Sequence, residues 1–423
     1  MEELLVFALI AAFILGFGAI SGRIQKTVIT PPMIFVVFGL LLGEWGLGLV
    51  ELELESEFVG VLAEFTLILV LFTDASRIDL ELLRKDHDLP VRLLAIGLPL
   101  TMIFGTGVAL VLFSELSIWV AVVLAIILAP TDAALGQAVV SSPKVPIRIR
   151  QALNVESGLN DGIALPILLF FLSLAGAMEA TRPINEWIQF GASQIILGPV
   201  IGVAVAYFGG RLISVAEHRE WVAESFQKLV ALGLALLAFS LAELVGGNGF
   251  IAAFCAGLTL GNMFSSVCGR LYEFAEAEGQ LLTLLTFLLF GAIMVPPALD
   301  HLSWQAVVYG VLSLTIIRMI PVALSLIGLG LQTQTFLFLG WFGPRGIASI
   351  LYILLVLDEV PDLPGLELMF QIVMVTVLIS VFAHGLTAVP ASNRYGDNTE
   401  AHKGDPDMPE LMVVSEMPVR IRH

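Results

Sequence analysis

Long apolar runs separated by short polar segments make up most of this chain. A helix needs about 20 apolar residues to cross the hydrocarbon core of a bilayer, and most of these runs have about that length. Runs this long favour helices over strands. We therefore predict an all-α polytopic membrane protein with about thirteen spans, at residues 4–20, 28–43, 58–76, 92–113, 116–141, 149–177, 187–215, 225–245, 249–265, 279–296, 304–329, 333–357 and 366–390.

The composition agrees with a membrane location. Hydrophobic residues make up 58% of the 423 residues and charged residues 13%, whereas soluble domains carry about 25% charged residues. The sequence begins Met1-Glu2-Glu3 with no basic segment before the first apolar run, so we interpret that run as a retained helix and not a signal peptide. The net charge of −17 argues against nucleic-acid binding. The two cysteines, Cys255 and Cys268, predict neither a disulfide framework nor a metal site.

The basic residues predict how the chain is oriented. Apart from Arg318 and Arg345, which lie deep within spans, the chain has eighteen Lys and Arg residues. Seventeen of them fall in odd-numbered loops, at the span ends next to these loops, or in the tail, and Arg182 is the exception. Basic loops face the cytoplasm, so we expect the N-terminus outside and the C-terminus inside. Acidic residues crowd two loops on the predicted outer side, at residues 44–57 and 358–367. They either attract cations to an entrance or are simply solvated.

We divide the chain into a transmembrane domain at residues 1–390 and a cytoplasmic C-terminal tail at residues 391–423. The tail is polar, contains proline and has mixed charge, so we expect it to be mobile. Residues 413–421 could dock back on the body, although nothing in the sequence requires it.

Two of the predicted spans are interrupted in the middle. Span five contains Pro130 just before Asp132, and span twelve contains Gly343-Pro344-Arg345-Gly346. Proline removes a backbone hydrogen bond and clashes with the preceding turn. The two broken spans are seven positions apart in the order of spans, and this odd offset gives them opposite orientations, as in transporters built from inverted repeats. A simple proline kink in each span is the alternative, but two charged breaks at matching positions favour the repeat.

The densest polar motif is Asn154-Val155-Glu156-Ser157-Gly158-Leu159-Asn160-Asp161-Gly162 in span six. A carboxylate near the bilayer centre costs about 2.5–3.5 kcal/mol on insertion scales, so it must face the protein interior or water. At 100° per residue, Glu156, Ser157, Asn160 and Asp161 fall within an arc of about 140°. One face of this helix is therefore polar at mid-depth.

Asp132 of span five is the natural partner of Asp161. Two aspartates, the Ser157 hydroxyl and a backbone carbonyl freed by the break at Pro130 make an oxygen-only site, which hard cations prefer. No His or Cys joins this cluster, which argues against zinc or copper. Burial and a second acidic group favour the protonated form of a carboxyl group. A proton and a cation can then compete for Asp161, which predicts cation/proton exchange.

Two arginines within the spans also need partners. Glu156 is the best candidate for Arg318 of span eleven, because a membrane-buried pair neutralises both charges. Arg345 at the second break either holds the interrupted backbone or pairs with Asp74 of span three. The sequence leaves both roles of Arg345 open.

These residues resemble the NhaP-type sodium/proton antiporters of the cation/proton antiporter superfamily. The resemblance rests on Pro130-Thr131-Asp132-Ala133, on residues 156–162, on Arg318 and on Gly343-Pro344-Arg345-Gly346, and its helical plan covers about 390 residues. It implies a core domain with crossed interrupted helices five and twelve, a dimerisation domain, and a homodimer that works by an elevator-like movement. It also implies an ion pair between Glu156 and Arg318.

The resemblance implies roles for the site residues as well. Asp161 would carry the ion or the proton, and Asp132, Ser157 and the Thr131 carbonyl would complete the cation site. Asn160 stands directly before Asp161, which implies the electroneutral branch that exchanges one cation for one proton. The short tail fits a multi-pass protein in the inner (plasma) membrane of a prokaryote.

We therefore predict a secondary transporter and not an enzyme, with Na⁺ or Li⁺ and protons as transported ions and no cofactor. No phosphate-binding glycine-rich loop is present, which argues against ATP drive. K⁺/H⁺ antiport stays open, because selectivity depends on fine ligand geometry. A cation channel would not require a titratable carboxylate at its centre. A sodium-coupled solute symporter would need an organic-anion pocket, for which no extra basic cluster is seen.

Overall fold

A computed structural model describes residues 2–24, 27–50, 56–85, 87–179, 184–264, 279–300, 302–401, 408–412 and 414. Every regular element in these segments is a helix, as predicted. Eight helices are long and apolar enough to cross a membrane, and four further apolar helices are shorter. A helix or a pair of half-helices lies at each predicted span. The count of thirteen crossings stays a prediction.

The helical elements follow one another along the described part of the chain. Residues 279–289 are also helical and continue directly into η2. The elements are α1 (Glu2–Ile24), α2 (Pro31–Leu42), α3 (Glu57–Ser76), α4 (Leu80–Lys85), α5 (Asp88–Arg92), η1 (Leu93–Gly97), α6 (Leu98–Leu112), α7 (Ile118–Ile127), α8 (Ala133–Val140), α9 (Ile147–Glu179), α10 (Ile184–His218), α11 (Glu224–Leu244), α12 (Gly249–Met263), η2 (Phe290–Met294), α14 (Val295–Asp300), α15 (Trp304–Leu314), α16 (Ile316–Ser325), α17 (Thr333–Trp341), α18 (Ile347–Glu359), α19 (Leu366–Glu400) and η3 (Pro409–Leu411).

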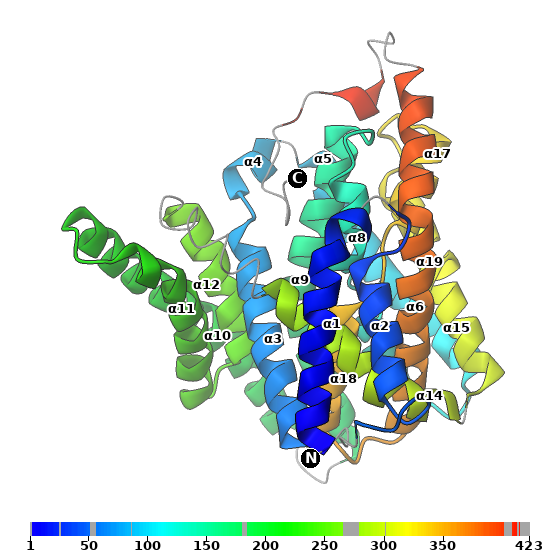
Figure 1. Ribbon diagram of the computed structural model, residues 1–423, viewed down its shortest axis with the longest axis horizontal. Helices are drawn as coiled ribbons and strands as arrows, with labels where there is room; N and C mark the ends of the chain where they lie inside the picture. The colour runs from blue at the N-terminus through cyan, green and yellow to red at the C-terminus, as the bar shows by residue number, and fades with distance from the viewer. Residues whose placement is uncertain are drawn as a thin grey trace.

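These helices pack in two groups. In the first group, α3, α10 and α11 all pack on α12. Helix α2 packs on η2, and α2 also contacts α19. In the second group, α7 packs between α6 and α9, while α19 contacts α8, α15, α17 and α18. Figure 1 shows α10, α11 and α12 on one side of the bundle and α6, α15, α17 and α19 on the other. The groups meet where α9 contacts α3 and α10, and where α18 contacts α3.

Glycines bring the helices of the first group into close contact. A Cβ atom added at Gly257 or Gly261 of α12 would overlap the carbonyl oxygen of Phe72 or Ser76 in α3. Gly202 of α10 lies equally close to the backbone of α12. Small residues at helix crossings are typical of packing inside membranes. Helix α12 is therefore held tightly between α3 and α10.

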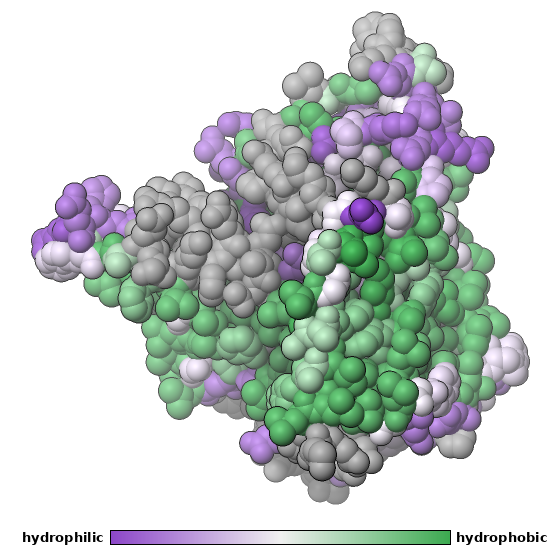
Figure 2. Space-filling view, in the orientation of Figure 1, coloured by the Kyte–Doolittle hydropathy of each residue, from purple (hydrophilic) through white to green (hydrophobic). Residues whose placement is uncertain are grey.

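The surface has the distribution expected for a protein in a bilayer. In Figure 2, apolar residues form a broad band across the middle of the visible face, with polar residues toward both ends. Helix α1 presents Leu4, Phe7 and Leu15 outward, and these side chains are 74%, 70% and 76% exposed. The start of α1 and the C-terminal end of α19 lie at opposite ends of the bundle (Figure 1), as an odd number of crossings requires.

Three irregular segments were not predicted. Helices α15 and α16 are separated at Thr315, which has φ −118° and ψ −97°, one turn before Arg318. The π-helical segments η1 and η2 are followed closely by Pro99 and Pro296. A proline lacks the N–H group that a carbonyl four residues earlier would receive. The wider π turn is the local backbone response in both places.

The end of the chain also differs from the prediction. Helix α19 runs to Glu400, ten residues beyond the predicted end of the last span at residue 390. Tyr395 and Thr399 in this extension are 4% and 2% exposed, so the extension is packed against the body. The segment at 413–421 that was considered for docking lies outside the described residues, apart from Val414.

A short segment at residues 408–412 binds at the N-terminus of α17. The buried Glu410 carboxylate accepts hydrogen bonds from the backbone N–H of Gln332 (2.7 Å) and from the Thr335 hydroxyl (2.8 Å). Arg148 of α9 donates to the Pro409 carbonyl (2.5 Å). A carboxylate at a helix N-terminus satisfies free N–H groups and complements the helix dipole. The segment therefore connects α9 to α17.

Replacing Glu410 with Ala should destabilise the protein, because it removes the acceptor at the start of α17. The expected loss in the free energy of unfolding is about 1–2 kcal/mol, the size of a lost helix cap. Thermal unfolding of the detergent-solubilised protein measures it. The control is Glu115→Ala at an exposed loop position, where the expected change is within about 0.5 kcal/mol. Equal midpoints for the two variants would contradict a stabilising role for Glu410.

Candidate ion-binding site

The first interrupted helix consists of α7 and α8, and the second of α17 and α18. Their non-helical segments meet, and Asp132 joins them. The backbone N–H of Asp132 donates to the Pro344 carbonyl (2.8 Å). Its Oδ1 accepts from the N–H of Ala134 (2.6 Å), at the start of α8, and its Oδ2 from the N–H of Ile347 (2.7 Å), at the start of α18. One carboxylate thus caps two half-helices whose positive dipole ends meet.

Glycine is required beside this carboxylate. A Cβ atom added at Gly346 would overlap Oδ2 of Asp132. The sequence predicted Asp132 as a cation ligand, and the structure places both of its oxygens on backbone N–H groups. Asp132 therefore holds the crossing together by its geometry, whatever it contributes to ion binding.

Arg345 lies at the second break, between α17 and α18, and its side chain binds the backbone at the first break, between α7 and α8. Its Nη1 donates to the carbonyls of Ala129 (2.5 Å) and Pro130 (2.9 Å), and its backbone N–H donates to the Ser380 hydroxyl (2.7 Å). Its side chain is 0% exposed. Those carbonyls follow the C-terminus of α7, where the helix dipole is negative and a cation is favourable. The sequence left two roles open for Arg345. These hydrogen bonds support the first of them, which is to hold the interrupted backbone.

Glu156 and Arg318 form a buried bidentate ion pair. Arg318 Nη1 lies 2.6 Å from Glu156 Oε1, and Nη2 lies 2.9 Å from Oε2. Both residues are 2% exposed. Gly343 makes room for this pair, because a Cβ atom there would overlap the Arg318 guanidinium group. The pair therefore connects α9, α16 and the second break.

The polar face of α9 meets the unwound segment at Thr131. The Thr131 hydroxyl lies 3.0 Å from the Ser157 hydroxyl, and Asn160 Nδ2 donates to Thr131 Oγ1 (2.7 Å) and Thr131 O (3.5 Å). Thr131, Ser157, Asn160 and Asp161 are between 1% and 9% exposed. Asn160 Oδ1 is buried and has no hydrogen-bond partner among the described residues. Hydroxyl, amide and carbonyl oxygens thus gather around Thr131, on the helical face that also carries Asp161.

The sequence reasoning missed several polar residues that support this site. Ser349 and Tyr352 of α18 donate to the carbonyls of Ile127 (2.8 Å) and Asp161 (2.9 Å). His384 of α19 contacts Ser380 and lies with Nε2 2.8 Å from the Trp341 carbonyl. Two polar residues one turn apart in the apolar run 347–357 were the available signal for α18.

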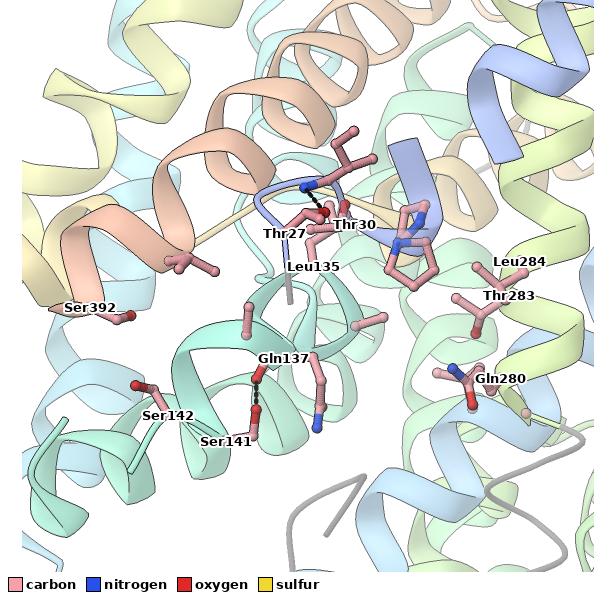
Figure 3. A pocket seen from close by; sticks show the side chains of 18 of the residues that line it. Thr27, Thr30, Leu135, Gln137, Ser141, Ser142, Gln280, Thr283, Leu284 and Ser392 are labelled. Atoms are coloured by element: carbon pink, nitrogen blue, oxygen red, sulfur yellow. Dashed lines mark hydrogen bonds between the residues drawn. The ribbon is translucent and has the colours of Figure 1, made fainter. Parts of the chain in front are cut away.

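A cavity of about 300 Å³ lies between the two helix groups and reaches the first turn of α8. Gln137 of α8 and Ser141, which follows α8, line it opposite Gln280 and Thr283 (Figure 3). Four buried polar atoms of its lining have no hydrogen-bond partner within the described part of the chain. They are Thr30 Oγ1, Gln137 Nε2, Thr283 Oγ1 and Ser392 Oγ. Buried polar groups of this kind are normally satisfied by water, so we expect the cavity to be hydrated.

Two crossed interrupted helices beside a buried polar face define the architecture of a secondary membrane transporter. Residues 8–394 match the family model described as sodium/hydrogen exchanger, transmembrane. The chain belongs to this family.

Two curated relatives carry different ion names. The K(+)/H(+) antiporter NhaP2 of Shewanella sp. (strain MR-4) is 23% identical over 391 residues, which cover 92% of this chain and 66% of that protein. The Na(+)/H(+) antiporter ApNhaP of Aphanothece halophytica is 28% identical over 420 residues, with coverage of 94% and 75%. This chain therefore spans slightly less than two thirds of the NhaP2 relative.

A solved structure shares the fold. The sodium proton antiporter MjNhaP1 from Methanocaldococcus jannaschii, determined at pH 8, superposes with a TM-score of 0.75 at 20% sequence identity. The match covers 94% of this chain and 100% of that one. The arrangement of the helices is therefore that of a known transporter fold.

Proposed function

We propose that the protein is a secondary active antiporter that exchanges a monovalent cation for protons across the plasma membrane of a prokaryote. The observation that carries this proposal is the buried Asp161 on the polar face of α9, where that face contacts the unwound Thr131 segment. A titratable carboxylate and neutral oxygen ligands at one place are what competition between a cation and a proton requires.

In the proposed mechanism, Asp161 carries either the proton or the cation. Ser157 and the Thr131 carbonyl supply neutral oxygen ligands, and Asn160 orients Thr131 through its amide. Asp132 completes the site and fixes the crossing of the two breaks. The buried site holds three acidic residues, Glu156, Asp132 and Asp161, and two arginines, Arg318 and Arg345. One net negative charge is therefore left for exchange, which supports electroneutral transport of one cation per proton.

We further propose that the second helix group is the moving core domain and the first group the dimerisation domain of a homodimer. The cavity between the groups supports this division, because it gives water and ions a route toward the start of α8. Its lining comes from helix ends and loops on the side that the basic residues assign to the cytoplasm, with the N-terminus outside and the C-terminus inside.

Sodium is the first candidate ion and potassium the second. The name of the Aphanothece relative favours sodium, and the names of the Shewanella relatives favour potassium. The oxygen-only ligand set is compatible with both ions, and the spacing of the ligands decides between them.

Cation-driven proton movement in proteoliposomes tests this proposal. Imposed gradients of Na⁺, Li⁺ and K⁺ should each be compared, with the membrane potential clamped or left free. We expect Na⁺ to dissipate a pH gradient at a rate that does not depend on the potential. Cation flux without proton counter-flow would instead indicate a channel. A rate that follows the potential would contradict one-for-one exchange.

A further inference from the structure

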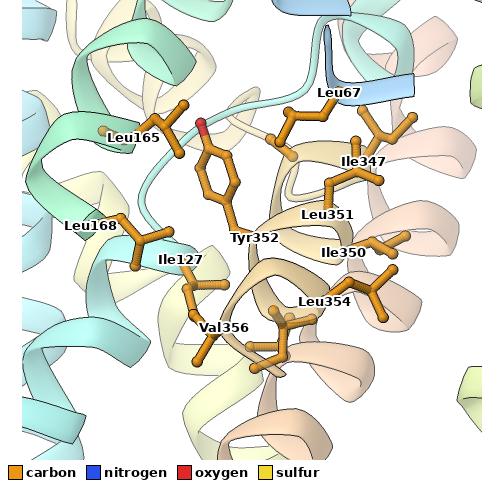
Figure 4. Packing of buried hydrophobic residues seen from close by; sticks show 14 of the residues in the cluster. Leu67, Ile127, Leu165, Leu168, Ile347, Ile350, Leu351, Tyr352, Leu354 and Val356 are labelled. Carbon is orange, nitrogen blue, oxygen red and sulfur yellow. The ribbon is translucent and has the colours of Figure 1, made fainter. Parts of the chain in front are cut away.

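Tyr352 places a hydroxyl group deep inside an apolar cluster. It lies on α18, is 0% exposed, and Figure 4 shows its ring among Leu165, Leu168 and Ile127. A hydroxyl group buried without a hydrogen bond would be costly. Here the hydroxyl donates to the backbone carbonyl of Asp161 at 2.9 Å. The hydrogen bond therefore ties α18 to α9 at the residue proposed to carry the ion.

Helix α9 is locally weak on the C-terminal side of Asp161. Pro166 lies inside the helix and has no N–H group to donate to the carbonyl of Gly162. Gly162 itself has no side chain, and a Cβ atom there would overlap the ring of Phe254 in α12. One backbone hydrogen bond of the helix, the bond to the Gly162 carbonyl, is thus missing directly after Asp161. A hydrogen bond from outside the helix has the most effect where the internal ladder is incomplete.

The donor side of this bond is rigid. Along α18, the N–H of Ile347 binds Asp132, the hydroxyl of Ser349 binds the Ile127 carbonyl at 2.8 Å, and Tyr352 follows one turn later. Helix α18 is therefore fixed to both sides of the first break before it reaches α9. Tyr352 extends the same frame to the backbone of Asp161.

We propose that Tyr352 is a positioning residue for ion binding. Its hydroxyl fixes the Asp161 backbone relative to α18, and through α18 relative to the break at Thr131. It thereby sets the distance between the Asp161 carboxylate and the neutral oxygen ligands. Tyr352 does not touch the ion, and this inference rests on the proposed role of Asp161.

The test is Tyr352→Phe, which removes one oxygen atom and keeps the ring that fills the apolar cluster. Tyr309→Phe is the matched control, because Tyr309 is also buried and donates to a helical carbonyl, that of Gly105, at 3.1 Å. Both variants lose one buried hydrogen bond, but Gly105 belongs to α6 and carries no proposed ion ligand. We expect the apparent KM for the cation to rise about three- to tenfold in Tyr352→Phe, with the maximal rate within about twofold of wild type.

A second readout does not depend on transport. Cation binding raises the thermal midpoint of the solubilised protein, and the cation concentration for half of this rise should increase by the same factor in Tyr352→Phe. In Tyr309→Phe, both the KM and this concentration should stay within about twofold of wild type. An unchanged KM in Tyr352→Phe, or an equal rise in both variants, would overturn the positioning role. If Asp161→Asn still exchanges ions, the proposed function itself fails, whatever Tyr352→Phe shows.

Discussion

Replacing Asp161 with Asn should reduce cation-driven proton movement in proteoliposomes to the level of protein-free liposomes. Asn has nearly the same shape as Asp, but its amide does not bind a proton in the pH range of the transport assay. It also lacks the negative charge that balances a cation. The site would then keep its hydroxyl and carbonyl oxygens and lose the group for which the ions compete. Fluorescence of a pH-sensitive dye after a sodium pulse measures the rate.

The fold should survive this replacement. The Tyr352 hydroxyl binds the backbone carbonyl of Asp161 and not its carboxylate, so the contact to α18 stays intact. The control is Asp88→Asn, the same acid-to-amide change at an exposed position in the first turn of α5. It should keep wild-type exchange. Exchange that persists in Asp161→Asn would mean that another group carries the proton, and the proposed mechanism would be wrong.

The broken helices could be predicted because their causes are local. Pro130 and Pro344 each lack an N–H group, and a membrane offers no water to replace the lost hydrogen bond. The pairing of Glu156 with Arg318 was also accessible, since two opposite charges in apolar spans have few alternatives to each other. In both cases the sequence carries the physical constraint itself.

The interruption at Thr315 and the role of Tyr352 were not accessible in the same way. No proline or glycine occupies position 315, so the sequence carries no strong local signal for the break between α15 and α16. Ser349 and Tyr352 stand out as polar residues in the run 347–357, but the run does not reveal what Tyr352 binds. Its partner lies 191 positions away in the chain, and only the folded helices bring the two together.

Asp132 shows how a correct residue can have a broader role than the sequence suggests. Its position beside Pro130 predicted a cation ligand. The structure adds that its two oxygens cap α8 and α18, which the sequence did not reveal because α18 begins more than 200 residues later. The same carboxylate that is proposed to complete the ion site therefore also determines where the two breaks cross.

Replacing Arg318 with Met should be strongly destabilising. The replacement removes the cation that binds both oxygens of Glu156 and leaves a buried carboxylate without its countercharge. Breaking one side of a buried pair costs about 3–5 kcal/mol. Thermal unfolding in detergent, together with the fraction of monodisperse protein on size-exclusion chromatography, measures the loss. Lys85→Met is the control, because the Lys85–Glu81 pair has a similar distance of 3.0 Å but both side chains are more than 60% exposed.

The double variant Glu156→Gln/Arg318→Met separates charge from packing. If the cost of the single variant comes from the uncompensated carboxylate, then neutralising Glu156 as well should recover a large part of the stability. Recovered stability with lost exchange would mean that the pair aligns α9 with the second break for transport. A double variant as unstable as Arg318→Met would instead assign the cost to the space that the guanidinium group fills beside Gly343. In that case the shape of the side chain, and not its charge, holds α16 against the crossing.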